Sequence, residues 1–371
     1  MKEKVLFSVI LSFVMLASCD GLNTQVEIKD PPPKPMEPDI AFLDTLESGV
    51  AVLRRGDSYY LEGDILLSAA QLQSLRETGS VFGEIVDSLS PARGINPVTN
   101  LPNDVSDTRA MGLYPTSYNL WAMCRFTYSS SLTTYQRNKI KAALEYIESV
   151  TNVRFYNATG QPTSHPILGI PYPYIEFVPF GNMSYCDSGL GRVGGRQEIR
   201  LANFAFEYGN LHVIIHEICH SLGMMHEQCR PDRDEYVIIN TSNLTEMGLS
   251  QFTKRTFDYY CLDNYDFNSV MGYDSYTSAD THVYNTNLPM YTKLDGSEIF
   301  QGLELSFDDR RWLNTLYVPY IARSDTYNEL DDVVYKSNNE IMTAEERLQY
   351  QAQLNNGNPN PPSGGHIPND F

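Results

Sequence analysis

Residues 216–220 of this 371-residue chain read His-Glu-Ile-Cys-His and are its most informative stretch. On a helix, His216 and His220 are four residues apart, so both imidazoles project from one face and can reach one metal ion. Glu217 lies beside the first imidazole and can hold a metal-bound water without being a ligand itself. The spacing therefore indicates a metal site with a carboxylate next to it.

The six residues that follow, Ser-Leu-Gly-Met-Met-His, bring a third histidine within reach. Gly223 can take the left-handed conformation that ends a helix, which lets the chain turn back and supply His226. Three imidazole nitrogens, an open fourth position and an adjacent carboxylate are the parts of a hydrolytic zinc centre.

The alternative is a helix with two surface histidines and an unrelated glutamate. The chain has seven histidines, and three of them fall within these eleven residues. Apolar side chains precede the motif and favour a buried helix, in which solvated histidines are out of place. These side chains are Leu211, Val213, Ile214 and Ile215.

The composition limits the class of protein. With 42% hydrophobic residues, the chain is long enough for one or two domains with a sizeable core. A formal net charge of −19 argues against nucleic acid and anionic lipid as partners.

The N-terminus has the features of an export signal. Lys2 and Lys4 precede an apolar run over residues 5–16, which is too short to span a bilayer in the mature protein. The run leads into Leu-Ala-Ser-Cys, ending at Cys19, and resembles the lipobox of bacterial lipoproteins. The resemblance implies cleavage before Cys19 and a lipid on its thiol, which would anchor the protein to a bacterial membrane or cell surface. An ordinary secretory signal with a chance cysteine is the alternative, and either signal takes the chain out of the cytoplasm.

Five cysteines remain beyond Cys19, so at least one thiol is unpaired in a monomer and the pairing cannot be deduced. They are Cys124, Cys186, Cys219, Cys229 and Cys261.

The chain also divides by composition. Residues 1–18 are the signal, 19–48 a proline-rich polar linker, and 319–371 an acidic tail expected to be partly disordered apart from a polar helix near 344–354. Between them, the clearest helix is predicted over 134–150, and the zinc helix over about 210–222. Strands are predicted near 58–61, 125–128, 153–155, 174–178 and 198–201, and shorter helices near 69–76 and 308–316. Strands followed by a helix that carries the site predict an α+β domain.

Two separate motifs resemble those of the astacins, which are metzincin zinc metalloendopeptidases. Residues 216–234 read HEICHSLGMMHEQCRPDRD and are similar to the extended zinc signature, and residues 265–273, YDFNSVMGY, are similar to the Met-turn. The similarity covers about residues 110–318. It implies a metzincin α+β catalytic domain with a twisted, mostly parallel sheet, an antiparallel edge strand beside the zinc helix, and an irregular C-terminal subdomain.

The resemblance implies roles for the site residues. His216, His220 and His226 would bind one Zn²⁺, and Glu217 would be the general base that takes a proton from zinc-bound water and passes it to the leaving amine. Tyr273 would ligate zinc at rest and swing out to stabilise the oxyanion.

Two further residues have open alternatives. Met271 would form an apolar floor under the metal, although a core methionine is the commoner explanation. Glu227 would anchor the mature N-terminal ammonium, or else form a surface salt bridge with Arg230 or Arg233.

The segment 49–109 resembles an astacin pro-segment. Leu61-Glu62-Gly63-Asp64 is similar to the family motif in which an aspartate ligates zinc in place of the catalytic water, so Asp64 would be a zinc switch; an ordinary Gly-Asp turn is the alternative. An activating protease that cuts near Arg109 would create a family-like N-terminus and free the catalytic domain from the lipid on Cys19.

The sequence departs from the family pattern at several positions. Asn152 and Tyr208 stand where cysteines are expected, so Cys186 lacks its usual partner; Cys229 and Cys261 could pair instead, or no disulfide forms. Gly272 replaces the usual histidine, and Met224 a frequent phenylalanine.

The leading hypothesis is a zinc endopeptidase that acts on proteins or peptides. A non-catalytic cell-surface adhesin or binding protein that retains the fold is the rival, and the intact ligands, base and tyrosine speak against it. A metzincin of another subfamily is disfavoured because glycine-aspartate calcium repeats are absent and the extension 227–234 is present.

Overall fold

The computed structural model describes residues 40–81, 110–113, 123–255, 259–262 and 264–369. No helix within these ranges is long and apolar enough to cross a lipid bilayer. The predicted signal, Cys19 and Arg109 lie outside the described residues.

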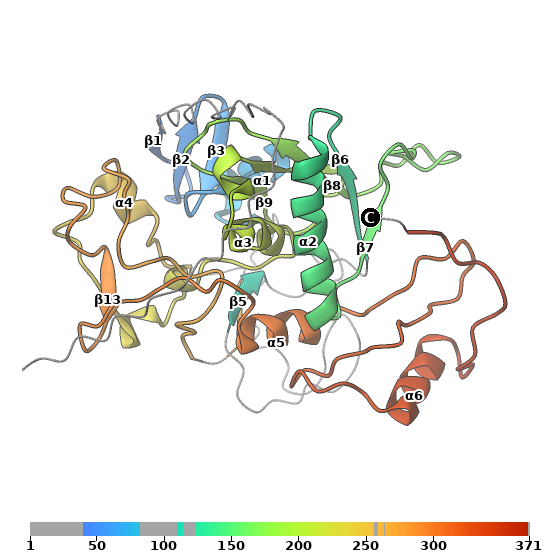
Figure 1. Ribbon diagram of the computed structural model, residues 1–371. Helices are drawn as coiled ribbons and strands as arrows, with labels where there is room; N and C mark the ends of the chain where they lie inside the picture. The colour runs from blue at the N-terminus through green and yellow to red at the C-terminus, as the bar shows by residue number, and fades with distance from the viewer. Residues whose placement is uncertain (1–39, 82–109, 114–122, 256–258, 263, 370–371) are drawn as a thin grey trace, which may run out of the picture. The chain divides into compact units, whose positions relative to one another are not determined.

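A nine-stranded sheet runs through the described fold (Figure 1). Across the sheet, its strands are β1 (Phe42–Thr45), β2 (Ala51–Arg55), β3 (Ser58–Leu61), β4 (Ile65–Leu66), β9 (Asp187–Gly189), β10 (Arg196–Leu201), β8 (Tyr174–Pro179), β6 (Cys124–Tyr128) and β7 (Phe155–Asn157). The pairs β10–β8, β8–β6 and β6–β7 are parallel, and β9 is antiparallel to β10. The predicted α+β class and the mostly parallel sheet of the catalytic region are confirmed.

The antiparallel strand β9 is not at the edge of the whole sheet. Strand β4 pairs with its other side in parallel, with Ile65 opposite Ser188, and β3, β2 and β1 follow as antiparallel neighbours. The segment predicted to be a pro-segment therefore supplies main-chain partners to a strand that would otherwise be exposed. Because β1 begins at Phe42, the folded region also starts earlier than the predicted linker end at residue 48.

Two helices form the main core with the sheet. Helix α2 (Thr134–Val150) begins with a capping box of Thr133 and Gln136 and buries one apolar stripe, while α3 (Leu211–Ser221) contacts α2, β9 and β10. The stripe on α2 consists of Ile140, Ala143, Leu144 and Ile147. Helix α3 is buried from Ile214 to Ser221, which explains its apolar sequence before the histidines.

A second core joins residues 40–81, called the early segment below, to the rest of the fold. Helix α1 (Ala69–Thr78) contributes Leu75, and β2 to β4 contribute Val52, Leu61 and Ile65. These side chains share one cluster with Met225 and Cys229, which flank the third histidine. The early segment is thus packed against the chain around the predicted site.

The region after the zinc helix is mostly irregular, as predicted. It contains β11 (Val237–Ile239) paired with β13 (Tyr291–Lys293), β12 (Tyr259–Leu262) paired with β5 (Ala110–Leu113), the short α4 (Glu246–Ser250) and α5 (Phe307–Leu316).

Residues 319–369, expected to be partly disordered, instead follow a defined course. Helix α6 (Ala344–Leu354) lies where a polar helix was predicted, and Val318, Leu330, Val334 and Tyr350 form a small core. Side chains tie this segment to the sheet: Arg154 pairs with Asp331 at 2.7 Å, and Asn369 bonds the backbone of β7. Composition alone suggested disorder, whereas side-chain to main-chain hydrogen bonds hold the segment.

Candidate metal centre

Helix α3 and the turn that follows it bring the three histidines together. His216 and His220 lie one turn apart on α3, and Gly223, with a φ of +102°, reverses the chain after it. The amide of Met224 donates to Cys219 O at 2.9 Å and closes this turn. His226 then reaches the same point, with its Nε2 3.2 Å from that of His216.

The opposite ring nitrogens of the histidines have acceptors of their own. His216 Nδ1 lies 2.8 Å from Val270 O, and His220 Nδ1 lies 2.8 Å from Met224 O. A carbonyl oxygen can only accept, so these Nδ1 atoms carry the protons. Their Nε2 lone pairs are thereby free to bind a metal.

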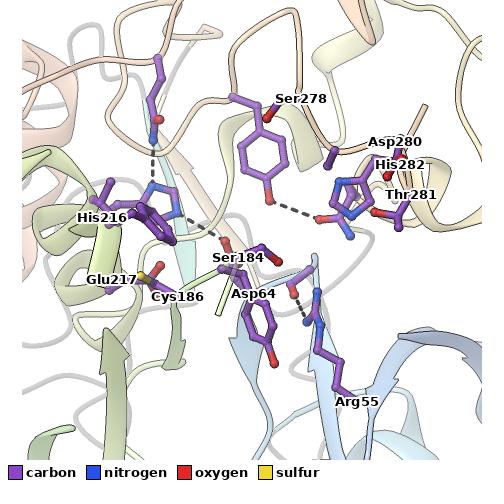
Figure 2. Close-up of a pocket in the computed structure, with 18 residues that line it drawn as sticks. Arg55, Asp64, Ser184, Cys186, His216, Glu217, Ser278, Asp280, Thr281 and His282 are labelled. Carbon is purple, nitrogen blue, oxygen red and sulfur yellow. Dashed lines mark hydrogen bonds and ion pairs between the residues drawn. The ribbon is translucent and has the colours of Figure 1, made fainter. Parts of the chain in front are cut away.

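Asp64 reaches the histidines from the β3–β4 segment. One of its oxygens lies 3.4 Å from His226 Nε2 and 3.7 Å from His216 Nε2, and the other lies 3.5 Å from His220 Nε2. Burial alone would raise the pKa of Asp64, but the three histidines lower it well below its usual range. Figure 2 shows Asp64 directed at His216 across the cleft.

The turn that carries Asp64 requires glycine. Gly63 has a φ of +103°, and a Cβ there would lie 1.8 Å from Gln251 Oε1. Arg55 donates to Gly63 O, and the amide of Ser188 donates to Asp64 O at 3.1 Å. The aspartate is therefore positioned by its backbone.

Glu217 is 3% exposed and lines a cleft of about 470 Å³ together with Asp64 and His216. Burial first, and then the nearby carboxylates of Asp64 and Asp187, raise the pKa of Glu217 well above its ordinary value. Its Oε2 has no hydrogen-bond partner among the described residues. A buried carboxylate oxygen without a partner is aligned for a group that the chain does not supply.

The four side chains suit a single zinc ion. Ligand atoms of Asp64, His216, His220 and His226 all lie within 4.8 Å of one another. Three imidazole nitrogens and one carboxylate oxygen are zinc ligands of the usual kind, and Asp64 Oδ1 has no hydrogen-bond partner in the described part of the chain.

Tyr273 stands next to this cluster but turns its hydroxyl towards the early segment. The hydroxyl donates to Glu62 O and lies 3.2 Å from Gln251 Oε1, and the ring lies edge-on to His226 at 4.7 Å. Met271 is 1% exposed within the main core.

Glu227 pairs with Arg230, as one alternative predicted, but the pair is buried and not on the surface. It is 1% exposed, accepts from the amide of Asp266 at 2.8 Å and lies 3.4 Å from Arg230 Nη1. Burial raises the pKa of Glu227 to about 8, although Arg230 and the amide of Asp266 act in the opposite direction. The structure does not test its predicted contact with a mature N-terminus.

Sequence reasoning missed a second carboxylate beside the cluster. Glu62 Oε2 lies 3.3 Å from His226 Nδ1 and 3.2 Å from its amide nitrogen, and Glu62 Oε1 accepts from Arg255 Nε at 2.6 Å. Burial would raise the pKa of Glu62, but Arg255 and His226 lower it to about 2. The only feature of the sequence that could have pointed to Glu62 is its position two residues before Asp64. Arg255 lies in no motif.

The described cysteines are all free thiols, including Cys229 and Cys261. At the positions where cysteines were expected, Asn152 is buried and hydrogen-bonded to Asn314 and Tyr335, and Tyr208 is 99% exposed.

An α+β domain in which one helix presents two histidines and a glutamate to a metal, with a third histidine after a glycine turn, is a zincin-type domain. A sequence model of the peptidase family described as "Astacin" matches residues 114–318. The chain belongs to the astacin family.

Curated relatives agree with this assignment. The chain is 34% identical over 266 residues to zinc metalloproteinase nas-13 of Caenorhabditis elegans, covering 69% of this chain and 49% of the relative. It is 32% identical over 246 residues to flavastacin of Elizabethkingia meningoseptica, covering 63% and 51%. The chain thus spans about half the length of these relatives.

Among solved structures, high choriolytic enzyme 1, a hatching enzyme zinc-protease from Oryzias latipes, is 26% identical. The alignment covers 55% of this chain and 93% of that one, with a TM-score of 0.44.

Proposed function

We propose that the chain is a zinc-dependent endopeptidase that is made as a zymogen, with Asp64 as its inhibitor. The observation that carries the proposal is the convergence of three imidazoles with Asp64, which comes from a separate segment. Asp64 and His216 line one cleft together with Glu217. The names of the relatives, which are zinc metalloproteinases, support it, and so does membership of a peptidase family.

Zinc, when bound by His216, His220 and His226, would polarise a substrate carbonyl and make a water molecule more acidic. Glu217 would accept the proton of that water and donate it to the leaving amine. Its burial at the cleft supports this role, because a desolvated carboxylate is a stronger base than one in water. The Tyr273 hydroxyl contacts Glu62 O and Gln251 Oε1, and it would lose its Glu62 partner once the early segment leaves. It would then turn from Gln251 to donate to the oxyanion of the substrate.

Inhibition by Asp64 is supported by its position. The carboxylate lies among the three Nε2 atoms, where a substrate carbonyl would have to bind. Substrate and Asp64 therefore exclude each other. Cleavage near Arg109 would break the covalent link between the early segment and the catalytic region, so that the segment could dissociate.

Attachment to a membrane through a lipid on Cys19 also belongs to the proposal, with release of the catalytic domain on activation. The sequence of residues 2–19 supports it. Fractionation combined with N-terminal sequencing tests it, because a protein that stays fully membrane-bound after cleavage would contradict release.

The proposed activity is tested with purified protein on casein, before and after limited trypsin, beside Glu217→Ala and Glu217→Gln. We expect activity in trypsin-treated wild type only, with one zinc per chain in all samples. If treated wild type is as inactive as the variants while holding zinc, the chain is a binding protein that retains the fold.

A further inference from the structure

A hairpin between β7 and β8 presents an apolar tip to solvent. Its arms are joined at the base by Tyr172 N donating to Thr163 O at 2.9 Å, and nearer the turn by His165 N donating to Ile170 O at 2.8 Å. Residues 163–172 are called the tip hairpin below. In Figure 1 it lies in the light-green loop that projects beyond β6 and β7.

The turn of the tip hairpin is well defined. His165 Nδ1 accepts from the amides of Ile167 and Leu168, at 3.3 and 3.2 Å, and Gly169 N donates to His165 O at 2.9 Å. Gly169 has a φ of +65°, which suits glycine. The conformation is thus fixed before any partner binds, and little ordering entropy remains to oppose binding.

The base of the hairpin is fastened to the sheet. Arg125 of β6 donates to Pro162 O at 2.7 Å and lies 4.8 Å from the ring of Tyr172. The ring of Tyr172 also lies 6.3 Å from that of His165. The tip hairpin is therefore held in a fixed position relative to strand β6.

Three aliphatic side chains lie at the turn and are largely exposed. Ile167 is 86% exposed, Leu168 65% and Ile170 59%. Within the described residues, no part of the chain covers them. Scattered exposed apolar residues are ordinary, but three within four positions on a projecting turn form a compact apolar contact surface.

The hairpin and its flanks carry no charged residue. Between Arg154 and Glu176 there are 21 consecutive positions without Asp, Glu, Lys or Arg, although these make up 20% of the chain. At that frequency, about four charges would be expected. Tyr172 and Tyr174, both half-buried, lie at the base, and tyrosine is enriched at the level of lipid headgroups.

We propose that the tip hairpin inserts into the interface of a lipid bilayer without net charge, as a contact separate from the lipid on Cys19. A protein interface usually has a polar, partly charged rim around an apolar centre. The exposed polar residues beside this tip, Gln161 and Thr163, are uncharged, and Arg125 at the base is engaged by Pro162 O and the ring of Tyr172. A bilayer interface instead favours an uncharged apolar tip above tyrosines. The net charge of −19 selects zwitterionic over anionic lipid.

Docking of this kind would hold the domain at a surface independently of the anchor. No residue of the tip hairpin lines the cleft, so its insertion leaves the cleft open. A domain released from Cys19 would then exchange between the membrane and the soluble fraction, because a few buried aliphatic side chains give weak, reversible binding.

The test uses the chain from residue 19 with Cys19→Ser, so that neither the apolar run nor a lipid contributes. Co-sedimentation with phosphatidylcholine vesicles is measured for this protein, for Ile167→Ser/Leu168→Ser/Ile170→Ser, and for Leu288→Ser/Leu294→Ser/Leu303→Ser, which removes three exposed leucines elsewhere. We expect the tip variant to bind at least ~30-fold more weakly and the control within twofold of the parent. Vesicles containing phosphatidylglycerol should bind the parent less well.

A tryptophan probe gives a second readout. Leu168→Trp should show a blue-shifted emission with phosphatidylcholine vesicles and quenching by brominated lipid. Absence of vesicle binding by the parent, or equal binding by parent and tip variant, overturns the proposal. A parent dimer that the tip variant converts to a monomer, without vesicle binding, identifies a second copy as the occupant and overturns it as well.

Discussion

Glu62 and Arg255, 193 residues apart in the chain, form a buried ion pair with a distance of 2.6 Å between Glu62 Oε1 and Arg255 Nε. The two side chains are 3% and 9% exposed. The same carboxylate contacts His226, so one residue links the early segment both to the metal centre and to the loop after α4. The pair fastens the segment that carries Asp64.

Breaking this pair should loosen the early segment. Arg255→Met leaves the Glu62 carboxylate buried without its cation, at a cost of about 3–5 kcal/mol. We expect faster cleavage of residues 40–81 by chymotrypsin in the uncut protein. Glu62→Met/Arg255→Met removes both charges and should restore much of the resistance; equal susceptibility of the single and double variants would show that the pair does not hold the segment.

Asp64→Ala should activate the uncut chain. Without the carboxylate among the histidines, we expect casein hydrolysis before trypsin treatment to rise tenfold or more, which corresponds to about 1.4 kcal/mol of lost inhibition. Asp57→Ala, at the exposed turn between β2 and β3, is the matched control and should change nothing. Unchanged activity of the Asp64 variant at full zinc content would refute the switch.

Gly63→Ala should displace the aspartate without removing it. The new Cβ would lie 1.8 Å from Gln251 Oε1 at a φ of +103°, so the turn or Gln251 must move. We expect partial activity before cleavage. Gly56→Ala shares the left-handed conformation, with a φ of +59°, but has open space around it and should leave inhibition intact.

Glu148 should make stability depend on pH. Burial raises the pKa of Glu148 to about 7 from an ordinary 4.5, even though the amide of Phe155 donates to it at 2.7 Å. The native state therefore binds more protons than the unfolded chain between these values, and stability falls as pH rises from about 4.5 to 7. Glu148→Gln keeps an acceptor and should be more stable than wild type at pH 8 by about 1–3 kcal/mol, but no more stable at pH 4, in urea unfolding.

Asn152 should matter to the C-terminal segment. Its side chain donates to Tyr335 O and accepts from Tyr335 N, both at 2.7 Å. Asn152→Ala leaves buried main-chain groups unpaired and should cost about 2–4 kcal/mol, with faster hydrogen exchange across residues 330–340. Tyr208→Ala, at the other position where a cysteine was expected, removes an exposed side chain and should have no effect on either measurement.

The features that could be predicted from the sequence depend on residues close together in the chain. Apolar residues at helical spacing predicted α2 at its observed bounds, and the histidine cluster was visible because its ligands lie within eleven residues. The pairing of Glu62 with Arg255 could not be predicted from the spacing of apolar residues, because it depends on how two segments far apart in the sequence meet. Strand β9 has only three residues, too few for an alternating pattern.

The prediction of partial disorder in the C-terminal segment was wrong for a different reason. Its asparagines suggested disorder by composition, yet Asn355 and Asn369 satisfy main-chain groups of neighbouring segments. Composition does not show which polar side chains find a fixed partner.

The position of Asp64 ahead of the three histidines in the sequence has a consequence for biosynthesis. His226, the last of the three histidines, is made 164 residues after Glu62, which at roughly 5–20 residues per second is a delay of about 8–30 s. Asp64 is therefore already present when the final ligand leaves the ribosome. If the proposed switch holds, a nascent chain has no interval in which the metal centre is complete and unguarded, and the cell that makes it is protected from the first moment of folding.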